Sequence, residues 1–194
     1  MRVECWFIAL SSSGMTGGRR NRIYASFITN FGVVLPMSDL LPLPEPRLQF
    51  FADLRVQVGV PQEVGQTAHG LRRLIPITGG TATGNGWTAR VLPGGADFQL
   101  IVNDRLSELD ARYVIETDGG DFIYVQNRAV RSGPPELIAR LVRGEPVDPA
   151  QIYFRCSPSF ETASPALGWI AERMFVGSGA RYPDAVVMRF FELA

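Results

Sequence analysis

The chain has 194 residues and a mass of 21.4 kDa, enough for one domain of ordinary size and marginal for two. Hydrophobic residues make up 46% and charged residues 20%, a balance typical of a globular protein and not of a disordered one. Nineteen basic residues balance nineteen acidic ones, and no run is long enough to span a bilayer, so neither nucleic acid nor a membrane is an expected partner.

The residue types that are absent or rare exclude several kinds of chemistry. All nineteen basic residues are arginine, which excludes a Schiff-base lysine, a lysine base and a lysine-dependent phosphate loop. His69 is the one histidine, and we interpret it as a solvated loop residue. Cys5 and Cys156 lie far apart in the sequence and provide neither a disulfide framework nor a zinc cluster. We therefore predict no metal site and no cofactor.

The first 36 residues differ from the rest, with four arginines against one glutamate and a net charge of +3. Their apolar stretch, Cys5–Leu10, is too short for a secretory signal, so we expect a cytoplasmic protein. We interpret 1–36 as an N-terminal extension, either disordered or upstream of a true start at Met37; a functional leader is the alternative. Residues 37–47 form a proline-rich linker, and 48–194 the folded domain.

Beyond Arg47, short β-rich runs alternate with clusters of Gly, Pro, Asn and Asp. Several runs alternate polar and apolar residues with a period of two, which is typical of antiparallel strands with unlike faces. One helix is predicted between Pro134 and Gly144. The predicted strands are Leu48–Val58, Leu71–Thr78, Gly86–Leu92, Ala96–Val102, Asp110–Thr117, Phe122–Ala129, Gln151–Ser157, Trp169–Val176 and Ala185–Leu193. The pattern predicts an all-β fold, a single small antiparallel β-barrel of about nine strands with one short helix.

Glycine-rich segments mark the expected turns. The segment Asp118–Asp121 joins two alternating runs and predicts a hairpin. The pairs Gly79-Gly80 and Gly94-Gly95 predict two further sharp reversals. The run from Gly79 to Gly86 lacks both the lysine and the following helix of a phosphate loop, so we interpret it as a loop or a turn at the barrel rim.

Motifs along the chain resemble a known family. Gly65-Gln66-Thr67 followed by residues 70–80 (GLRRLIPITGG) is similar to the opening motif of the DUF3237 family, also called UPF0311. Four later segments are similar as well: 92–99 (LPGGADFQ), 110–113 (DARY), 153–155 (YFR) and 169–179. The likeness covers residues 46–194 and implies a single-domain, calycin-like β-barrel. It assigns no catalytic residue.

One set of polar residues lies on the polar faces of the predicted inner strands: Asp97, Gln99, Arg112, Tyr153 and Arg155. If these faces point outward, the residues form weak ion pairs in water. If they point into the barrel, Asp97 is a candidate base, and Arg112, Tyr153 and Arg155 are candidates to stabilise an oxyanion. The predicted ligand-binding residues are Gln99, Arg72, Arg73 and Trp169. Residue alternation alone leaves both orientations open.

Three functions remain open from the sequence. The first is a cofactor-independent isomerase, cyclase or lyase that acts on an enolisable carbonyl or carboxylate compound. The second is a carrier whose barrel binds a small molecule without changing it. The third is an interaction module that forms a homo-oligomer through an edge strand. A small-molecule ligand is the expected partner in the first two.

Overall fold

The computed structural model describes residues 27–28, 34–35 and 43–194. Within the first part, the short strands β1 (Phe27–Ile28) and β2 (Val34–Leu35) pair antiparallel. The N-terminal extension predicted at residues 1–36 and the linker up to residue 42 otherwise lie outside the described residues, so the structure does not test those predictions. The chain divides between Pro44 and Glu45, and Glu45–Ala194 form one compact unit.

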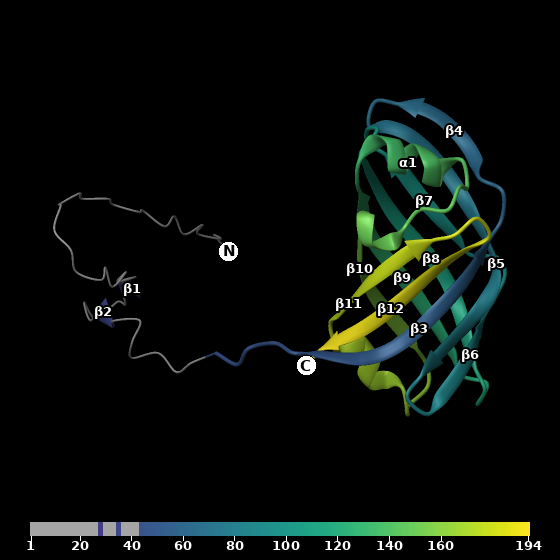
Figure 1. The fold of residues 1–194 in the computed structure, drawn as a ribbon. Helices are drawn as coiled ribbons and strands as arrows, with labels where there is room; N and C mark the ends of the chain where they lie inside the picture. The colour runs from purple at the N-terminus through teal and green to yellow at the C-terminus, as the bar shows by residue number, and fades with distance from the viewer. Residues whose placement is uncertain (1–26, 29–33, 36–42) are drawn as a thin grey trace, which may run out of the picture. The chain divides into compact units, whose positions relative to one another are not determined.

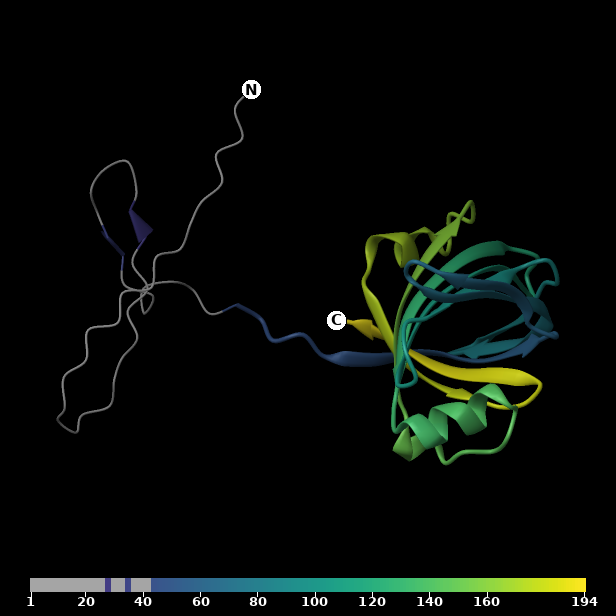
Figure 2. The same cartoon turned by 90° about the horizontal axis from the view of Figure 1, so that it is seen from above.

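That unit is a closed antiparallel β-barrel, which confirms the predicted fold (Figure 1, Figure 2). Its ten strands are β3 (Leu48–Val58), β4 (Gln62–Thr67), β5 (Gly70–Gly84), β6 (Trp87–Val91), β7 (Ala96–Ile101), β8 (Leu106–Thr117), β9 (Phe122–Ser132), β10 (Tyr153–Thr162), β11 (Phe175–Arg181) and β12 (Ala185–Leu193). Neighbours follow the order β3-β12-β11-β10-β9-β8-β6-β5, and the β3–β5 pairing closes the ring. The strands β4 and β7 are additional: β4 pairs with β5, and β7 lies between β5 and β8.

Three helices accompany the barrel: α1 (Pro135–Val142) and the 3-10 helices η2 (Pro149–Gln151) and η3 (Gly168–Glu172). The predicted helix at Pro134–Gly144 is therefore present as α1; it ends at Val142, and Gly144, two residues later, has a φ of 78°. The strand predicted at Trp169–Val176 is wrong over residues 169–174, because η3 occupies 169–172 and β11 begins only at Phe175. In the described part of the chain, no helix is long and apolar enough to cross a membrane.

The strand β5 bends where the sequence predicted a reversal. It continues through Gly79 and Gly80, pairing with β7 before the two glycines and with β3 along and after them. Gly80 has a φ of 137°, and a Cβ at this position would overlap the backbone carbonyl of Arg55. The two glycines therefore let β5 bend and approach β3 closely, so one long strand serves two parts of the wall. The turns at Gly94-Gly95 and Asp118–Asp121 are present as predicted.

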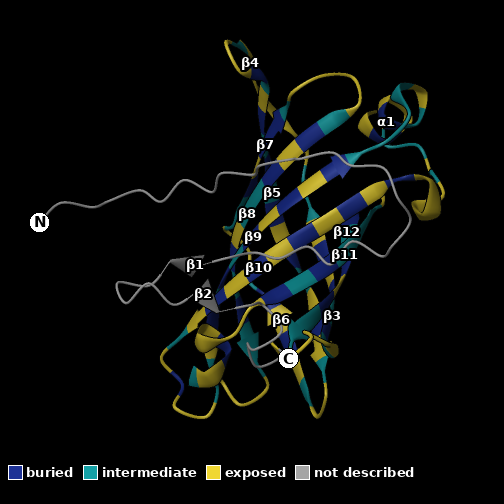
Figure 3. Cartoon of the chain, turned by 90° about the vertical axis from the view of Figure 1, so that its left-hand side faces the viewer, coloured by how far each residue is buried: buried dark blue, intermediate teal, exposed yellow. Residues whose placement is uncertain are grey.

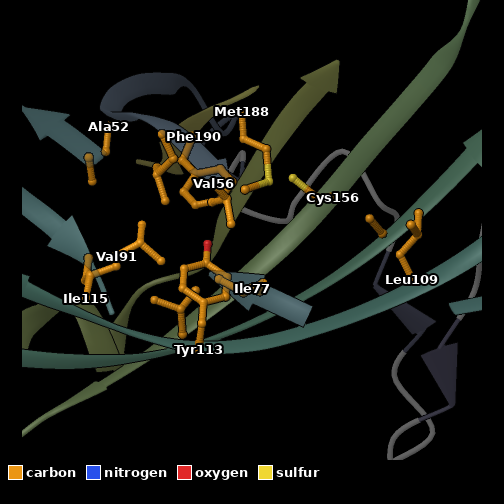
Figure 4. Packing of buried hydrophobic residues seen from close by; sticks show 14 of the residues in the cluster. Ala52, Val56, Ile77, Val91, Leu109, Tyr113, Ile115, Cys156, Met188 and Phe190 are labelled. Carbon is orange, nitrogen blue, oxygen red and sulfur yellow. The ribbon is translucent and has the colours of Figure 1, made fainter. Parts of the chain in front are cut away.

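Alternation of buried and exposed residues runs along most strands (Figure 3). The apolar side chains that point inward fill the barrel, and Phe175, Phe190 and Val125 are almost completely buried. The hydroxyl of Tyr113 is directed into this packed interior (Figure 4). At the end of the barrel that carries β4 and α1 (Figure 1), polar side chains replace apolar ones inside the wall.

Candidate functional site

The predicted polar set is divided between the two sides of the barrel wall. Asp97 and Gln99 are 8% and 2% exposed and point inward, although the apolar neighbour Phe98 is 46% exposed. Tyr153 is 55% exposed, and the side chain of Arg112 is 49% exposed. The structure therefore brings Asp97 and Gln99 together but does not bring them to Arg112, Tyr153 or Arg155.

The residues on the outer side form ordinary surface contacts. Arg112 Nη2 lies 2.9 Å from Asp110 Oδ2, and Arg155 stacks 5.1 Å from the ring centre of Tyr153. With Arg72, the Tyr153 and Arg155 side chains line an open surface groove of about 530 Å³. Exposed ion pairs of this kind contribute only about 0.2–1 kcal/mol to stability. Their orientation is the outward alternative considered from the sequence.

Inside the barrel, three side chains form a hydrogen-bonded chain across β5 and β7. Arg73 Nε donates to Gln99 Oε1 at 2.9 Å, and Gln99 Nε2 donates to Asp97 Oδ2 at 2.5 Å. Arg73 stands directly opposite Gln99 in the strand pairing, so the backbone register holds the two together. Both predicted ligand-binding residues in this chain, Arg73 and Gln99, are buried with Asp97. The amide of Gln99 thereby fixes the orientation of the Asp97 carboxyl group.

Two further arginines lie close to this chain. Arg131, on β9, is 2% exposed, and Arg181, at the end of β11, is partly buried. Burial, together with the nearby charge of Arg73, lowers the pKa of Arg131 to about 10. Burial also lowers the pKa values of Arg73 and Arg181. With Asp97, these three arginines form what we call the lumen cluster.

The lumen cluster carries an excess of positive charge. The charge of one buried carboxylate, Asp97, acts on all three arginines, while Glu63 and Asp184 act on Arg73 and Arg181 from exposed positions. Burial raises the pKa of Asp97, against the lowering effects of the Gln99 hydrogen bond and of the Arg131 charge. Buried charges without partners are costly, so such an excess favours a negatively charged or strongly polar group in their midst.

Several buried polar atoms in this region have no hydrogen-bond partner within the described structure. They are Asp97 Oδ1, Ser107 Oγ, Tyr113 Oη, Asn127 Oδ1 and Arg131 Nε. Ser107 and Arg131 are direct partners in the β8–β9 pairing, as are Ala111 and Asn127, and Ala111 also faces Asp97. Because native proteins rarely leave buried polar groups unpaired, these atoms mark a place suited to a bound molecule or to water.

The free space beside these atoms is small. Asp97, Gln99, Tyr113, Asn127 and Arg181 line a cavity of about 30 Å³. A second cavity of about 10 Å³ lies between Arg131 and Leu141 of α1, and it shares Phe154 and Arg181 with the first. Together they hold one or two water molecules or a small polar head group.

The sequence did not identify Arg131, Arg181, Tyr113 or Asn127 as site residues. A signal was present for two of them, because Asn127 and Arg131 continue the inward alternation of Ile123 and Val125 along β9. The predicted strand stopped at Ala129 and so excluded Arg131. No local pattern distinguishes Arg181, whose position depends on where β11 ends.

The remaining predicted residues lie elsewhere. Trp169, on η3, is 42% exposed and lies at the end of the barrel opposite the lumen cluster, against Phe51. His69 is exposed in the turn between β4 and β5. Cys156 is buried in the apolar core, and burial raises the pKa of its thiol to about 12. Among the residues that the structure describes, no three His, Cys, Asp or Glu side chains gather as a metal site would require.

Comparison with known proteins identifies the family of this chain. The model of DUF3237, described as a protein of unknown function, matches residues 46–193. The UPF0311 protein RPA1785 of Rhodopseudomonas palustris is 46% identical over 145 residues, covering 75% of this chain and 95% of the relative. A UPF0311 protein of Clostridium acetobutylicum is 38% identical over 157 residues, covering 80% and 99%.

Solved structures agree on the fold. The crystal structure of RPA1785 is 42% identical, with a TM-score of 0.74, covering 78% of this chain and all of that one. A "beta-barrel like protein" from Acinetobacter baumannii is 37% identical, with a TM-score of 0.71, covering 80% of this chain and all of that one. An enzyme from Penicillium herquei, with a TM-score of 0.59 and 19% identity, shares the fold over 80% of this chain. Sequence, fold and relatives agree that the chain belongs to the DUF3237 family, also called UPF0311.

Proposed function

We propose that the lumen cluster binds the anionic or carbonyl head of a small molecule, and that Asp97 transfers a proton on it. The reaction is that of a cofactor-independent isomerase, cyclase or lyase acting on an enolisable carbonyl or carboxylate compound. The observation that carries the proposal is the buried excess of positive charge around a carboxylate whose Oδ1 has no described partner. The sequence suggested Arg112, Tyr153 and Arg155 for stabilising the oxyanion, but these side chains lie outside the barrel. We assign that role instead to Arg131, Arg181 and Tyr113, which lie inside it.

The chemistry follows from the arrangement. Asp97 Oδ1 removes a proton from the carbon next to the carbonyl, and the C–H electron pair becomes the C=C bond of an enolate. The negative charge on the enolate oxygen is stabilised by the guanidinium groups of Arg131 and Arg181. With a β,γ-unsaturated carbonyl substrate the enolate extends over the second C=C bond, and protonated Asp97 returns the proton to the γ-carbon. The C=C bond thereby moves into conjugation with the carbonyl group, and the isomerisation is complete without an oxidant or a cofactor. The raised pKa of Asp97 makes it a stronger base than an ordinary aspartate.

Gln99 has a positioning role in this scheme. Its amide holds Asp97 Oδ2, which leaves Oδ1 for the substrate, and Arg73 holds the amide in turn. One relative supports a role in small-molecule chemistry: PR-toxin biosynthesis cluster protein 7 of Penicillium roqueforti is 33% identical over 98 residues, covering 43% of this chain and 53% of the relative. A carrier function uses the same lumen cluster but involves no proton transfer.

The test is native mass spectrometry of the protein after incubation with a cell-metabolite extract. Wild-type protein is expected to capture an anionic compound whose mass or fragmentation pattern changes with time. The Asp97→Asn variant is expected to capture the same compound and leave it unchanged. Asp104→Asn, the same substitution at an exposed loop position, is the matched control and is expected to behave as wild type.

Each other outcome has a definite meaning. If Asp97→Asn converts the captured compound at the wild-type rate, Asp97 is not the group that transfers the proton. If wild-type protein captures a compound but never changes it, the protein is a carrier and not an enzyme. Protein that captures nothing would contradict the binding function of the lumen cluster, and dimer peaks in the same spectra would favour the homo-oligomeric interaction module.

A further inference from the structure

The end of the barrel opposite the lumen cluster contains a larger pocket with different walls. It has a volume of about 510 Å³, and its lining includes the rings of Phe51, Trp87 and Trp169 and the carboxylates of Asp118, Asp121 and Glu192. We call it the end pocket. The strands β3 and β12, the β5–β6 and β8–β9 turns and the helix η3 contribute its walls, at the end near β6 (Figure 1).

The aromatic side of the end pocket is formed by rings inclined to one another. The Phe51 centroid lies 5.8 Å from that of Trp87, at 51°, and 5.9 Å from that of Trp169, at 85°. The rings therefore form adjoining walls and not a parallel stack. Trp87 packs directly against the backbone of Gly84, where a Cβ would overlap the indole ring. Because Gly84 has no side chain, the indole of Trp87 can lie against its backbone.

The acidic side is held in position by the β8–β9 turn. The Thr88 hydroxyl donates to Asp118 Oδ2, and the Asp118 backbone N–H donates to the Thr88 carbonyl at 3.0 Å. The Asp121 backbone N–H donates to the Thr117 hydroxyl at 3.1 Å. These bonds orient the turn, and both aspartates line the pocket without an arginine partner in the described part of the chain.

The charge of the end pocket is opposite to that of the lumen cluster. Of its three carboxylates, Glu192 pairs with Arg173 at 3.3 Å, which leaves two negative charges in excess. Aromatic faces beside fixed negative charges attract an organic cation, because the ring quadrupole and the carboxylates act in the same direction. An inorganic cation would use the carboxylates but not the aromatic walls, which favour an apolar or aromatic body.

We propose that the end pocket is a second binding site, for an organic ammonium ion with an aromatic or apolar body. The ammonium group lies toward Asp118 and Asp121, and the body packs among Phe51, Trp87 and Trp169. This site does not depend on the chemistry proposed for the lumen cluster. It is separated from it by the apolar core of the barrel, which includes Ile115, Ile123 and Phe160.

The test uses benzyltrimethylammonium as the probe and the full chain labelled with ¹⁵N. The indole N–H signals of Trp87 and Trp169, assigned from the Trp87→Phe and Trp169→Phe variants, report on the pocket directly. Both signals are expected to move on titration and to give one dissociation constant. The neutral compound benzyl alcohol and the anion phenylacetate are expected to move them far less, because neither carries a positive charge.

The acidic residues are tested by the double variant D118N/D121N. Asparagine keeps an oxygen that can accept the Thr88 hydrogen bond, so the turn is expected to fold, and the affinity for the cation is expected to fall about tenfold. The matched control Asp104→Asn is expected to leave the affinity unchanged. An equal response to benzyl alcohol, an unchanged affinity in D118N/D121N, or indole signals that do not move would each overturn the proposal.

Discussion

Asp97 and Phe98 are neighbours in β7, and the charged residue is buried while the aromatic one lies outside. Asp97 is 8% exposed and Phe98 is 46% exposed. In a barrel whose interior is mostly apolar, this inversion costs desolvation of a carboxyl group, and it occurs where the charges of Arg131 and Arg73 act on that group. This inversion is one reason why we propose a ligand site inside the barrel.

The first prediction concerns pH and stability. Burial raises the pKa of Asp97 in the folded state above its unfolded value of about 3.9. The folded protein therefore binds the proton more tightly, and stability due to Asp97 is full below the unfolded pKa and is lost as pH rises through the folded pKa. Each pKa unit corresponds to about 1.4 kcal/mol. Because asparagine resembles the protonated acid, Asp97→Asn should gain stability relative to wild type between pH 4 and pH 8, as measured by urea unfolding. A constant difference would contradict the raised pKa.

The second prediction is that the buried Arg131 does not stabilise the folded protein. Arg131 is almost fully buried with Nε unpaired, so Arg131→Met removes a desolvated charge and fills the space with apolar atoms. Because Arg131 is also repelled by the charges of Arg73 and Arg181, we expect the free energy of unfolding to stay equal or to rise by roughly 1 kcal/mol. Arg128→Met, at an exposed position of the same strand, is the control. A loss of several kcal/mol in Arg131→Met alone would show that Arg131 is a structural ion-pair partner.

The third prediction concerns the apolar core. Phe190 is completely buried and Phe122, an exposed residue of β9, is 55% exposed. Phe190→Ala should cost about 3–5 kcal/mol, because it removes buried surface and leaves a cavity. Phe122→Ala should change stability by no more than about 0.5 kcal/mol. Denaturant unfolding of both variants measures the difference, and similar costs at the two positions would contradict the assigned interior.

The fourth prediction tests the bend in β5. An alanine at Gly80 would meet the Arg55 carbonyl and also require a positive φ, so Gly80→Ala should cost more than about 3 kcal/mol or prevent folding. Gly144→Ala, after α1, also requires a positive φ but has open space around it, so it should cost only about 1–2 kcal/mol. Thermal unfolding compares the two. Equal effects would mean that the close approach of β3 and β5 is not a constraint.

The fold was largely predictable because alternation and turn residues are local signals. The strand predicted at Leu48–Val58 and the one at Ala185–Leu193 match β3 and β12 to the residue. The strand β4 was missed because Gln62–Thr67 is polar and exposed, with no buried face to produce alternation. Gly79-Gly80 was misinterpreted because a bend and a reversal both require glycine, and only the pairing partners distinguish them.

The site was less predictable, for a physical reason. Alternation assigns residues to two faces of a strand but does not say which face points inward. On β10 the apolar face of Phe154 and Cys156 is inside, whereas on β7 the polar face of Asp97 and Gln99 is inside. Treating all polar faces alike grouped residues that lie on opposite sides of the wall. The distinction depends on the charges of Arg73, Arg131 and Arg181, which come from other strands.

We propose that the ligand site lies inside the barrel and not on its outer face. Native mass spectrometry of Arg131→Met and Arg112→Met, incubated with the same metabolite extract, tests it with one substitution on each side of the wall. We expect Arg112→Met to capture the wild-type compound and Arg131→Met, still folded, to capture none. Capture by Arg131→Met at the wild-type level, or loss of capture in Arg112→Met, would mean that the site is not inside the barrel.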